Sequence, residues 1–347
     1  MVIKAFILAG GKGARLRPLT LHTPKPIVPV ANIPFLFFQI DHIKQAGITE
    51  IILSLSYQPR KIEDMFGDGI KYGVTMRYTH EDLPLGTAGA LRGAEHLIDD
   101  TTVVLNGDVL TDTSLREVIQ YHRERKAEAT IVLVRVMNPT GYGLVEADAQ
   151  GRVVRFTEKP AEDEITGDTI NAGIYVLERS ILERIARGGP QSFECDVFPQ
   201  LLAEGARFYA YLTRNYWQDI GNPQKYLEAH YGIITGRMKL PLYPLKACPP
   251  NHWEKKQVQI DSVSILDGGC VIKPGVVIEN SVLGEDCRIE EGALIRDSVV
   301  WAGTRICKNA RLERALVGRQ CHVGEGARLR PGTVLGDKAT VTDYSVL

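Results

Sequence analysis

The strongest constraint on the fold is an aliphatic side chain that recurs almost every six residues near the C-terminus. The recurring positions are Ile272, Ile278, Leu283, Ile289, Ile295, Val300, Ile306, Leu312, Val317, Val323, Leu329, Leu335 and Val341. Three steps span 17 residues, except that the last three span 18. A hexad of this kind is one short strand and a turn, and three of them close a triangular coil. The pattern predicts a left-handed parallel β-helix of hexapeptide repeats with the aliphatic side chains stacked inside.

The same period places a column of small side chains one coil apart, at Cys270, Cys287, Thr304 and Cys321. Neighbouring coils are spaced by about 4.8 Å, so these residues are expected to be stacked and structural. A disulfide between Cys270 and Cys287 is the alternative, and it requires an oxidising compartment.

The N-terminal part of the chain has a different pattern, in which short apolar runs rich in β-branched residues alternate with helical patterns. The runs lie at 3–9, 50–57, 102–109, 130–136 and 170–177, and a helix is predicted between Pro34 and Gly47. This alternation predicts an α/β domain with a Rossmann-like, mostly parallel sheet. Ligands of such sheets bind beyond the carboxyl ends of the strands, so we expect the site from Gly10 onward and around Asp108.

Prolines separate the two patterns, because Pro241, Pro244, Pro249 and Pro250 forbid a continuous helix there. We therefore expect a catalytic domain at 1–240, a Pro-rich linker at 241–257 and the β-helix at 258–347.

Charge and composition argue against several classes of partner. The chain has 41 Lys and Arg against 42 Asp and Glu, with a formal net charge of −1, so neither nucleic acid nor an anionic membrane is an expected partner. No apolar stretch approaches the roughly 20 residues of a membrane span, and the first apolar run is too short for a signal peptide. The six cysteines lack C-x-x-C spacing. A cytoplasmic protein is the simplest interpretation.

A glycine-rich segment with basic residues follows the first predicted strand. It reads Leu8-Ala9-Gly10-Gly11-Lys12-Gly13-Ala14-Arg15-Leu16-Arg17-Pro18-Leu19-Thr20 and continues to Pro24-Lys25-Pro26. Glycines at such a turn let backbone N–H groups face an anion, which suits a triphosphate. Arg15 offers a bidentate contact to phosphate oxygens, and Lys25 adds positive charge. The spacing fits neither a P-loop nor the dinucleotide fingerprint, so the alternative is a plain turn with exposed basic residues.

The segment resembles the signature of the sugar-phosphate nucleotidyltransferases, and six further segments resemble that family in the same order. They are Leu85–Gly89, Asn106–Val109, Gly141–Gly143, Phe156–Pro160, Asn171–Tyr175 and Trp217–Gly221. The hexad coils are similar to those that many members carry after the catalytic domain. Within the family, 84–89 and 192–199 are most similar to the GDP-mannose pyrophosphorylases. The resemblance implies transfer of a nucleoside monophosphate from an NTP to a sugar 1-phosphate, with release of pyrophosphate.

The resemblance also implies a role for each matching residue. Among the catalytic residues Arg15, Lys25 and Asp108, Arg15 would stabilise the departing pyrophosphate and Lys25 the α-phosphate. Asp108 and Asp219 would hold Mg²⁺, the expected cofactor, on the phosphates. The NTP would contact Leu8, Ala9, Gly10, Gly11, Gly13, Glu81 and Gly86. The sugar phosphate would contact Gly143, Glu158, Lys159 and Asn171.

The expected chemistry needs no general base, because a phosphate monoester with a second pKa of about 6 is already largely ionised at neutral pH. Positioning and charge neutralisation therefore dominate. For the two aspartates the alternative is an ordinary cap or turn role, and for Glu158 and Lys159 it is an exposed charge pair in a loop.

The choice of base depends on Glu81, which precedes Gly86 by five residues. A carboxylate accepts from guanine N1–H and N2–H₂ together, whereas an amide better suits uracil or thymine. This favours GTP, unless Glu81 points to solvent. The resemblance favours mannose 1-phosphate, and glucose 1-phosphate with dTTP or UTP is the alternative, because the two sugars differ at one hydroxyl.

Two positions depart from the family pattern: Ala14 stands where Thr or Ser is common, and Ile33 where a basic residue is common. We expect them to change affinity or substrate preference before chemistry. A non-catalytic regulatory subunit that binds sugar nucleotides is the alternative of another class. Acyl transfer by the β-helix is less favoured, because only His322 lies within the coils, and it aligns with Arg288 and Arg305. The strand edges that end a β-helix need covering, so a homo-oligomer formed through it is expected.

Overall fold

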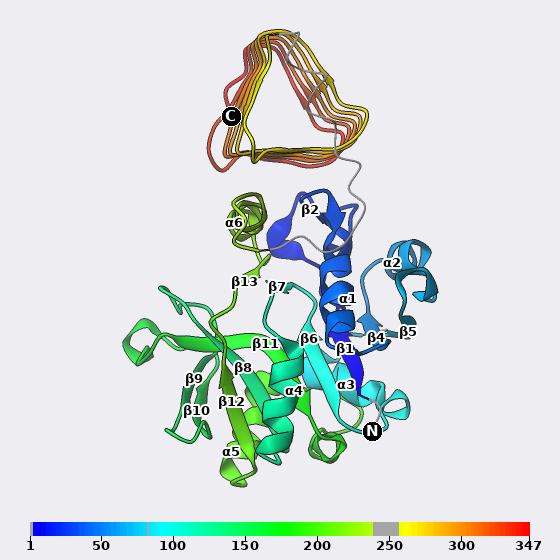
Figure 1. Ribbon diagram of the computed structural model, residues 1–347, viewed down its shortest axis with the longest axis vertical. Coiled ribbons are helices and arrows are strands. Elements are labelled where there is room, and N and C mark those ends of the chain that lie inside the picture. The colour runs from blue at the N-terminus through cyan, green and yellow to red at the C-terminus, as the bar shows by residue number, and fades with distance from the viewer. Residues whose placement is uncertain (1–2, 82, 239–256) are drawn as a thin grey trace. The chain divides into compact units, whose positions relative to one another are not determined.

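The computed structural model describes residues 3–81, 83–238 and 257–347 (Figure 1). The chain divides into two compact units, of which the first contains Met1–Gly11 and Gln39–Trp217 and the second Lys12–Phe38 and Gln218–Leu347. The segment Lys12–Phe38, which carries the predicted Arg15 and Lys25, therefore belongs to the same unit as the C-terminal coils. Apart from Gln257, the predicted linker at 241–257 lies outside the described residues.

A nine-stranded sheet forms the centre of the first unit, in the order β10-β9-β11-β6-β1-β4-β5, with β8 pairing β11 and β12. The strands are β1 (Lys4–Leu8), β4 (Glu50–Leu55), β5 (Thr75–His80), β6 (Thr102–Asn106), β8 (Ala129–Arg135), β9 (Leu144–Ala147), β10 (Val153–Thr157), β11 (Thr169–Leu177) and β12 (Phe208–Leu212). The predicted α/β class with a Rossmann-like sheet is confirmed, and all five predicted strands are present.

The sheet is mixed, with parallel pairing restricted to part of it. Strands β6, β1, β4 and β5 run parallel, as expected where crossover segments join them. Strand β11 runs antiparallel to β6, β8 and β9. It follows the antiparallel β9–β10 pair without an intervening α-helix, and short connections of that kind favour antiparallel strands.

Helices and short strands complete the fold. The helices are α1 (Phe35–Gln45), α2 (Pro59–Phe66), α3 (Gly86–Gly93), α4 (Leu115–Glu124), α5 (Phe198–Ala203) and α6 (Pro223–Ile234). The short strands outside the large sheet are β2 (Pro29–Val30), β3 (Ile33–Pro34), β7 (Val109–Thr111) and β13 (Trp217–Asp219). Helix α6 begins with Pro223 directly after Asn222, whose Oδ1 accepts a hydrogen bond from Lys225 N at 2.9 Å, an N-cap of the usual kind.

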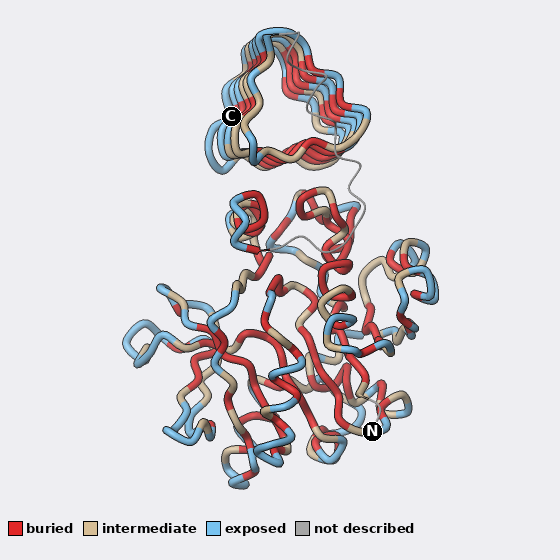
Figure 2. Tube along the Cα trace, in the orientation of Figure 1, coloured by how far each residue is buried: buried red, intermediate tan, exposed pale blue. Residues whose placement is uncertain are grey.

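The core of the first unit lies along the central strands, which are buried on both faces (Figure 2). Phe6 of β1, Val104 of β6 and Tyr175 of β11 are all fully buried and belong to one cluster. Continuous apolar strands are typical of such sheets. The consequence is that the polar residues at the carboxyl ends of these strands emerge from a rigid scaffold.

The C-terminal coils form three parallel five-stranded sheets, drawn as the three sides of a triangle in Figure 1. The first sheet is β14 (Gln259–Ile260), β17 (Val277–Glu279), β20 (Leu294–Arg296), β23 (Arg311–Glu313) and β26 (Arg328–Leu329). The second is β15 (Ile265–Leu266), β18 (Val282–Leu283), β21 (Val299–Val300), β24 (Leu316–Val317) and β27 (Val334–Leu335). The third is β16 (Val271–Ile272), β19 (Arg288–Ile289), β22 (Arg305–Ile306), β25 (His322–Val323) and β28 (Thr340–Val341).

The predicted ladders of aliphatic residues are confirmed. Ile272 pairs with Ile289, and Ile289 with Ile306, and the inner side of the coil is buried (Figure 2). Burying one such side chain contributes roughly 1.5–3 kcal/mol. The step between the last coils is one residue longer, since Val323 pairs with Val341.

The column of small residues is also confirmed. Cys270, Cys287 and Cys321 are buried free thiols, so the disulfide alternative is not formed. The Cys270 thiol donates to Gly284 O at 3.2 Å, and the Thr304 hydroxyl donates to Gly318 O at 2.8 Å. His322 pairs in register with Arg305, as predicted.

Candidate active site

The end of β1 and the end of β6 are held together by Gly107. Gly107 N donates to Leu8 O at 2.8 Å, and a Cβ on Gly107 would lie only 2.4 Å from that oxygen. Ala9 N donates to Ser54 O at 3.0 Å on the other side. Only glycine allows this close approach, so the Asn-Gly-Asp sequence fixes Asp108 at the carboxyl edge of the sheet beside the predicted nucleotide loop.

The carboxylate of Glu81 lies against Gly10. Its Oε1 accepts from Ser54 Oγ at 2.7 Å, and its Oε2 accepts from Leu85 N at 2.9 Å. A Cβ on Gly10 would approach Oε1 to 2.9 Å. The alternative in which Glu81 points to solvent is therefore wrong, because two donors hold the carboxylate over the loop. Each carboxylate oxygen keeps a lone pair for a ligand.

Gly86 begins helix α3 where another chain segment passes close by. Its φ is +73°, and a Cβ would lie 2.4 Å from Gln191 O. Gly10 and Gly11 by contrast belong to the loop after β1, and a Cβ on Gly11 would meet nothing within 4 Å. Glycine is thus required at position 86 by the close packing of the backbone. At Gly11, by contrast, the space beside the backbone is open to a ligand.

The predicted sugar-phosphate residues lie on β11 and on the loops beside it. Asn171 N donates to Gly143 O at 2.9 Å, and a Cβ on Gly143 would lie 2.9 Å from Glu158 Oε2. Glu158 and Lys159 form an ion pair of 3.1 Å, in which the Lys159 side chain is 66% exposed. The structure therefore brings Gly143, Glu158 and Asn171 together and leaves Lys159 projecting toward solvent beside them.

A carboxylate that the sequence prediction did not select, Glu194, lies next to this group. It accepts from Tyr175 OH at 3.3 Å and from Thr87 Oγ1 at 2.8 Å. It belongs to a π-helical turn over Phe193–Val197, which begins at Ser192 with a side-chain N-cap. Such turns are frequent at functional sites. The order Ser-x-Glu at positions 192–194, which is typical of a helix start, was the signal in the sequence that could have indicated this residue.

The second unit holds the basic residues on a segment with little regular structure. Arg15 lies exposed on a 3₁₀ turn over Ala14–Leu16, and Lys25 lies buried on another over Lys25–Ile27. Gly13 between β1 and Arg15 has a φ of +60°, and its Cβ would meet Lys25 Cβ at 3.1 Å. Gly13 therefore allows a tight turn in which the backbone just before Arg15 packs against Lys25.

Asp219 is buried in the same unit and lies beside Arg15. Its Oδ1 accepts from Gly221 N at 2.8 Å, and its Oδ2 forms an ion pair with Lys225 Nζ at 2.8 Å. A Cβ on Gly221 would lie 2.5 Å from Asp219 Oδ1 and 3.5 Å from Arg15 Nη2. The sequence Asp219-Ile220-Gly221 thus places a carboxylate and the Arg15 guanidinium close to one glycine.

The donor set fits Mg²⁺ bound through its substrate. No group of three or more His, Cys, Asp or Glu side chains able to hold a metal occurs within 3–81, 83–238 and 257–347. Mg²⁺ usually takes one or two carboxylates and completes its shell with phosphates and water. The carboxylates of Asp108 and Asp219 carry hard oxygen atoms, which are donors of the kind that this ion takes.

The segment Lys12–Phe38 is fastened to the β-helix and to α6. Arg319 Nη1 donates to Thr23 Oγ1 at 2.6 Å, and Asn32 Nδ2 donates to Leu283 O at 2.8 Å. Tyr226 of α6 donates to Pro29 O and accepts from Trp301 Nε1 at 3.1 Å. The segment that carries Arg15 and Lys25 is therefore supported by residues almost 300 positions away in sequence.

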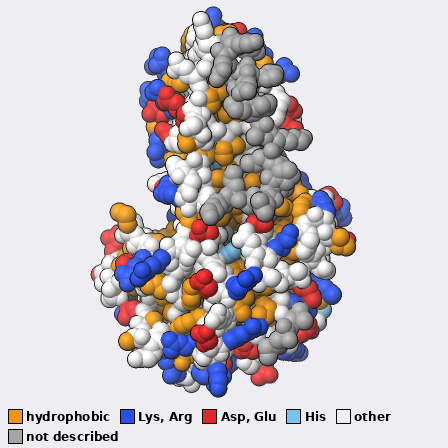
Figure 3. Space-filling view, viewed as in Figure 1, with side chains coloured by type: hydrophobic (Ala, Val, Ile, Leu, Met, Phe, Trp, Pro, Cys, Tyr) orange, Lys and Arg blue, Asp and Glu red, His pale blue; other side chains and the backbone are white. Residues whose placement is uncertain are grey.

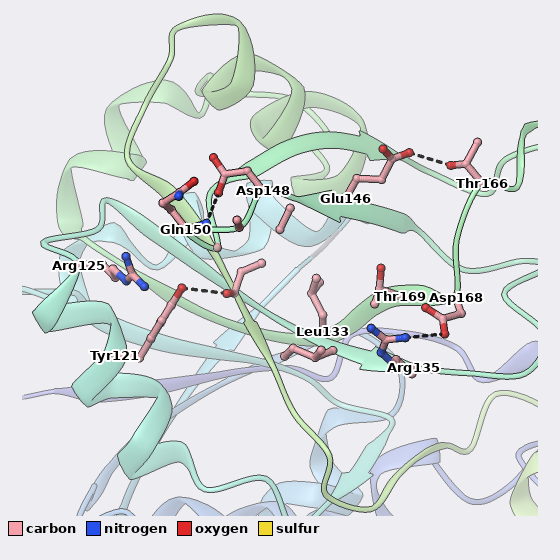
Figure 4. Close-up of a pocket in the computed structure, with 15 residues that line it drawn as sticks. Tyr121, Arg125, Leu133, Arg135, Glu146, Asp148, Gln150, Thr166, Asp168 and Thr169 are labelled. Carbon is pink, nitrogen blue, oxygen red and sulfur yellow. Dashed lines mark hydrogen bonds and ion pairs between the residues drawn. The ribbon is translucent and has the colours of Figure 1, made fainter.

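A pocket in the first unit lies at α4, β8, β9 and β12 and includes none of the predicted site residues (Figure 4). Several of its polar groups are paired within the lining: Arg135 pairs with Asp168 at 3.1 Å, and Glu146 accepts from Thr166 at 2.7 Å. We assign it no function. On the face drawn in Figure 3, basic and acidic side chains of the described residues are interspersed, unlike the single-signed surface that nucleic acid requires.

Comparison with known proteins defines the class. The nucleotidyl transferase family model matches residues 4–236, and the model of the left-handed β-helix domain of the EIF2B epsilon subunit matches residues 251–347. The chain belongs to the nucleotidyl transferase family, which confirms the resemblance seen in the sequence.

Individual relatives are more specific. The mannose-1-phosphate guanylyltransferase of Mycobacterium tuberculosis is 38% identical over 90% of this chain and 83% of its own length. A probable mannose-1-phosphate guanylyltransferase of rice is 37% identical over 98% of this chain and 93% of its own. Among solved structures, HddC of Yersinia pseudotuberculosis, crystallised with GMP-PN, is 31% identical with a TM-score of 0.57, covering 65% of this chain and 97% of that one.

A putative glucose-1-phosphate thymidylyltransferase of Bacillus anthracis has a TM-score of 0.61 and 26% identity over 66% of this chain and 94% of its own. The nucleotidyltransferase fold is therefore common to relatives that are named as transferases of different nucleotides, guanylyl and thymidylyl. None of the helices in the described part of the chain has the length and apolar character needed to cross a bilayer.

Proposed function

We propose that this chain transfers GMP from GTP to mannose 1-phosphate, giving GDP-mannose and pyrophosphate. The names of the similar full-length proteins support this substrate pair. The observation that carries the choice of base is Glu81, whose carboxylate is held against Gly10 by Ser54 and Leu85 N. An acceptor-only group at this place suits the adjacent N1–H and N2–H₂ donors of guanine.

In the proposed reaction, an oxygen of the sugar phosphate attacks the α-phosphorus while the bond from that phosphorus to the pyrophosphate oxygen breaks. No proton needs to be removed, because the attacking phosphate is already ionised. Arg15 and Lys25 would neutralise the charge that grows on the phosphates. Mg²⁺ held by Asp108 and Asp219 would supply further positive charge on the phosphate oxygens.

The sugar side of the proposed site consists of Gly143, Glu158, Lys159 and Asn171. Lys159, with its exposed ammonium group, would bind the phosphate of the sugar. Glu158 and Asn171 would hydrogen-bond sugar hydroxyls. The partners are thus GTP and the sugar 1-phosphate, and we further infer a homo-oligomer formed through the open strand edges of the β-helix.

The test is pyrophosphate release with Mg²⁺ for GTP, dTTP and UTP, each against mannose and glucose 1-phosphates. We expect turnover with GTP and mannose 1-phosphate, which EDTA and Asp108→Asn abolish. Glu81→Gln should lower kcat/KM for GTP by roughly 5- to 150-fold, as expected for a bidentate base contact of about 1–3 kcal/mol, and lower it less for dTTP.

Turnover confined to dTTP or UTP would disprove the base assignment and keep the reaction class. Absence of turnover for every pair, with sugar nucleotide still bound, would instead support a regulatory subunit. Ser54→Ala is a matched control for Glu81→Gln, because it removes one supporting hydrogen bond and leaves the carboxylate in place.

A further inference from the structure

The phenol of Tyr175 joins two polar side chains inside the first unit. Tyr175 is fully buried, and its hydroxyl lies 2.9 Å from Asn171 Nδ2 and 3.3 Å from Glu194 Oε1. Burial raises the pKa of the Tyr175 hydroxyl well above its usual value, so the proton stays on the phenol. A buried hydroxyl with one donor and one acceptor neighbour has a fixed direction of hydrogen bonding.

The direction of this chain of hydrogen bonds is set by Glu194. An ionised carboxylate only accepts hydrogen bonds, so the Tyr175 hydroxyl donates to Glu194 and its oxygen accepts from the Asn171 amide. Asn171 Oδ1 accepts from Gly173 N at 2.8 Å. The amide of Asn171 is therefore held in one of its two flipped orientations, with one N–H and one oxygen lone pair left for a ligand.

Glu194 is itself held firmly. Its Oε2 accepts from Ser192 Oγ at 2.6 Å and from Thr87 Oγ1 at 2.8 Å, and Thr87 Oγ1 accepts in turn from Phe193 N at 2.8 Å. Thr87 lies in α3, two residues after Leu85, whose N–H donates to Glu81. The carboxylate thus connects the start of α3 with Asn171 on β11.

We propose that Glu194 is a positioning residue for sugar recognition, which acts through Tyr175 to orient the Asn171 amide toward a hydroxyl of the sugar 1-phosphate. This inference rests on the proposed function, since Asn171 is a sugar-side residue only there. Glu194 need not touch the substrate. Its effect is expected on binding of the sugar phosphate and of the sugar nucleotide product, and not on binding of the NTP.

The test compares Glu194→Gln and Tyr175→Phe with Asp196→Asn. Asp196 lies in the same π-helical turn, but its carboxylate accepts from Ser192 N at 2.7 Å, so it is a matched control. We expect Glu194→Gln and Tyr175→Phe each to raise KM for the sugar 1-phosphate about 5- to 10-fold, as for loss of one oriented hydrogen bond, with KM for the NTP changed less than about twofold. The double variant should be no worse than Tyr175→Phe alone, because both changes break one chain.

Equal rises in KM for both substrates, additive effects in the double variant, or the same change in Asp196→Asn would overturn the proposal. Tyr175→Phe keeps the ring and removes only the hydroxyl, so it preserves the core if Glu194→Gln folds poorly. The kinetics use whichever sugar 1-phosphate the wild type turns over, so failure of the mannose assignment is seen separately. Calorimetric binding of GDP-mannose and GTP gives a second readout that does not need turnover, with weaker binding expected for GDP-mannose alone.

Discussion

The two compact units hold their predicted site residues in different ways. In the first unit, Glu81 directly follows β5 and is held by Ser54 of β4 and by Leu85 N, while Asn171 lies near the start of β11 and is held by Gly173 N of the same strand. In the second unit, Arg15 and Lys25 lie on short 3₁₀ turns, and the support comes from α6 and the β-helix. The segment Lys12–Phe38, which we propose to bind phosphate, is therefore supported by the C-terminal coils and α6.

The contrast has a physical origin. A strand end inherits its position from a ladder of backbone hydrogen bonds, so one or two side-chain bonds suffice to orient a residue there. Arg15 and Lys25 lie on turns outside the short β2–β3 ladder of their segment. Fixing each residue of such turns costs about 1–2 kcal/mol of conformational entropy. The bonds from Arg319 to Thr23 and from Asn32 to Leu283 offset part of that cost.

The largest expected effect comes from Arg15, an exposed arginine of the segment Lys12–Phe38. Arg15→Ala should lower kcat/KM for pyrophosphate release by about 10²- to 10³-fold, the usual cost of removing a group that stabilises developing charge. Arg15→Lys should recover only part of it, because lysine lacks the planar fork. Arg15 is exposed, so the melting temperature should not change.

Arg288→Ala is the matched control for this prediction, since Arg288 is an exposed arginine on β19 of the same unit. A loss below about tenfold in Arg15→Ala, or a similar loss in the control, would mean that this segment does not neutralise the phosphates.

A smaller effect is expected when the β-helix releases the segment. Arg319→Ala removes the bond to Thr23 and the stacking of the guanidinium on Trp301 at 4.6 Å. We expect kcat/KM to fall about 3- to 10-fold, as for loss of one charged hydrogen bond, and the amides of 12–38 to exchange faster with deuterium. Arg305→Ala, whose partner is Glu290, should change neither quantity. Equal deuterium exchange of residues 12–38 in Arg319→Ala and Arg305→Ala would show that the coils do not order this segment.

The parts predictable from sequence are those governed by local periodicity. The hexad step translates directly into the ladder of Ile272, Ile289 and Ile306, because each coil stacks on the one before it. Likewise a buried strand followed by glycine or aspartate identifies the carboxyl edge of a sheet, so Gly10 and Asp108 follow from pattern alone.

The parts that escaped prediction depend on contacts between distant residues. Glu194 meets Thr87 across 107 positions, and Arg319 meets Thr23 across 296. No local pattern encodes either contact. The grouping of Lys12–Phe38 with the coils escaped for the same reason, since a Pro-rich stretch marks a break in the chain without showing which earlier segment packs against the later one.

A last effect is expected on stability, and it concerns the support of the segment Lys12–Phe38 by α6. His230 of α6 is fully buried, and its Nδ1 accepts from Ala31 N at 3.2 Å. Burial lowers the pKa of His230 to about 3. The unfolded chain binds this proton below a pH of about 6.5, so the folded state loses stability as the pH falls from there toward about 3, by up to about 1.4 kcal/mol per pH unit.

The measurement is urea unfolding of wild type and His230→Gln between about pH 7 and pH 4.5, because glutamine keeps an acceptor for Ala31 N without titrating. The wild type should lose more free energy of unfolding on acidification than the variant. Half-buried His42 and buried His122, whose pKa values are also lowered by desolvation, contribute equally to both. Parallel curves would mean that protonation of His230 does not lower the free energy of unfolding. In that case water reaches His230 where α6 packs against the segment. A steeper wild-type curve would show that burial of the neutral His230 imidazole makes the folded state sensitive to acid.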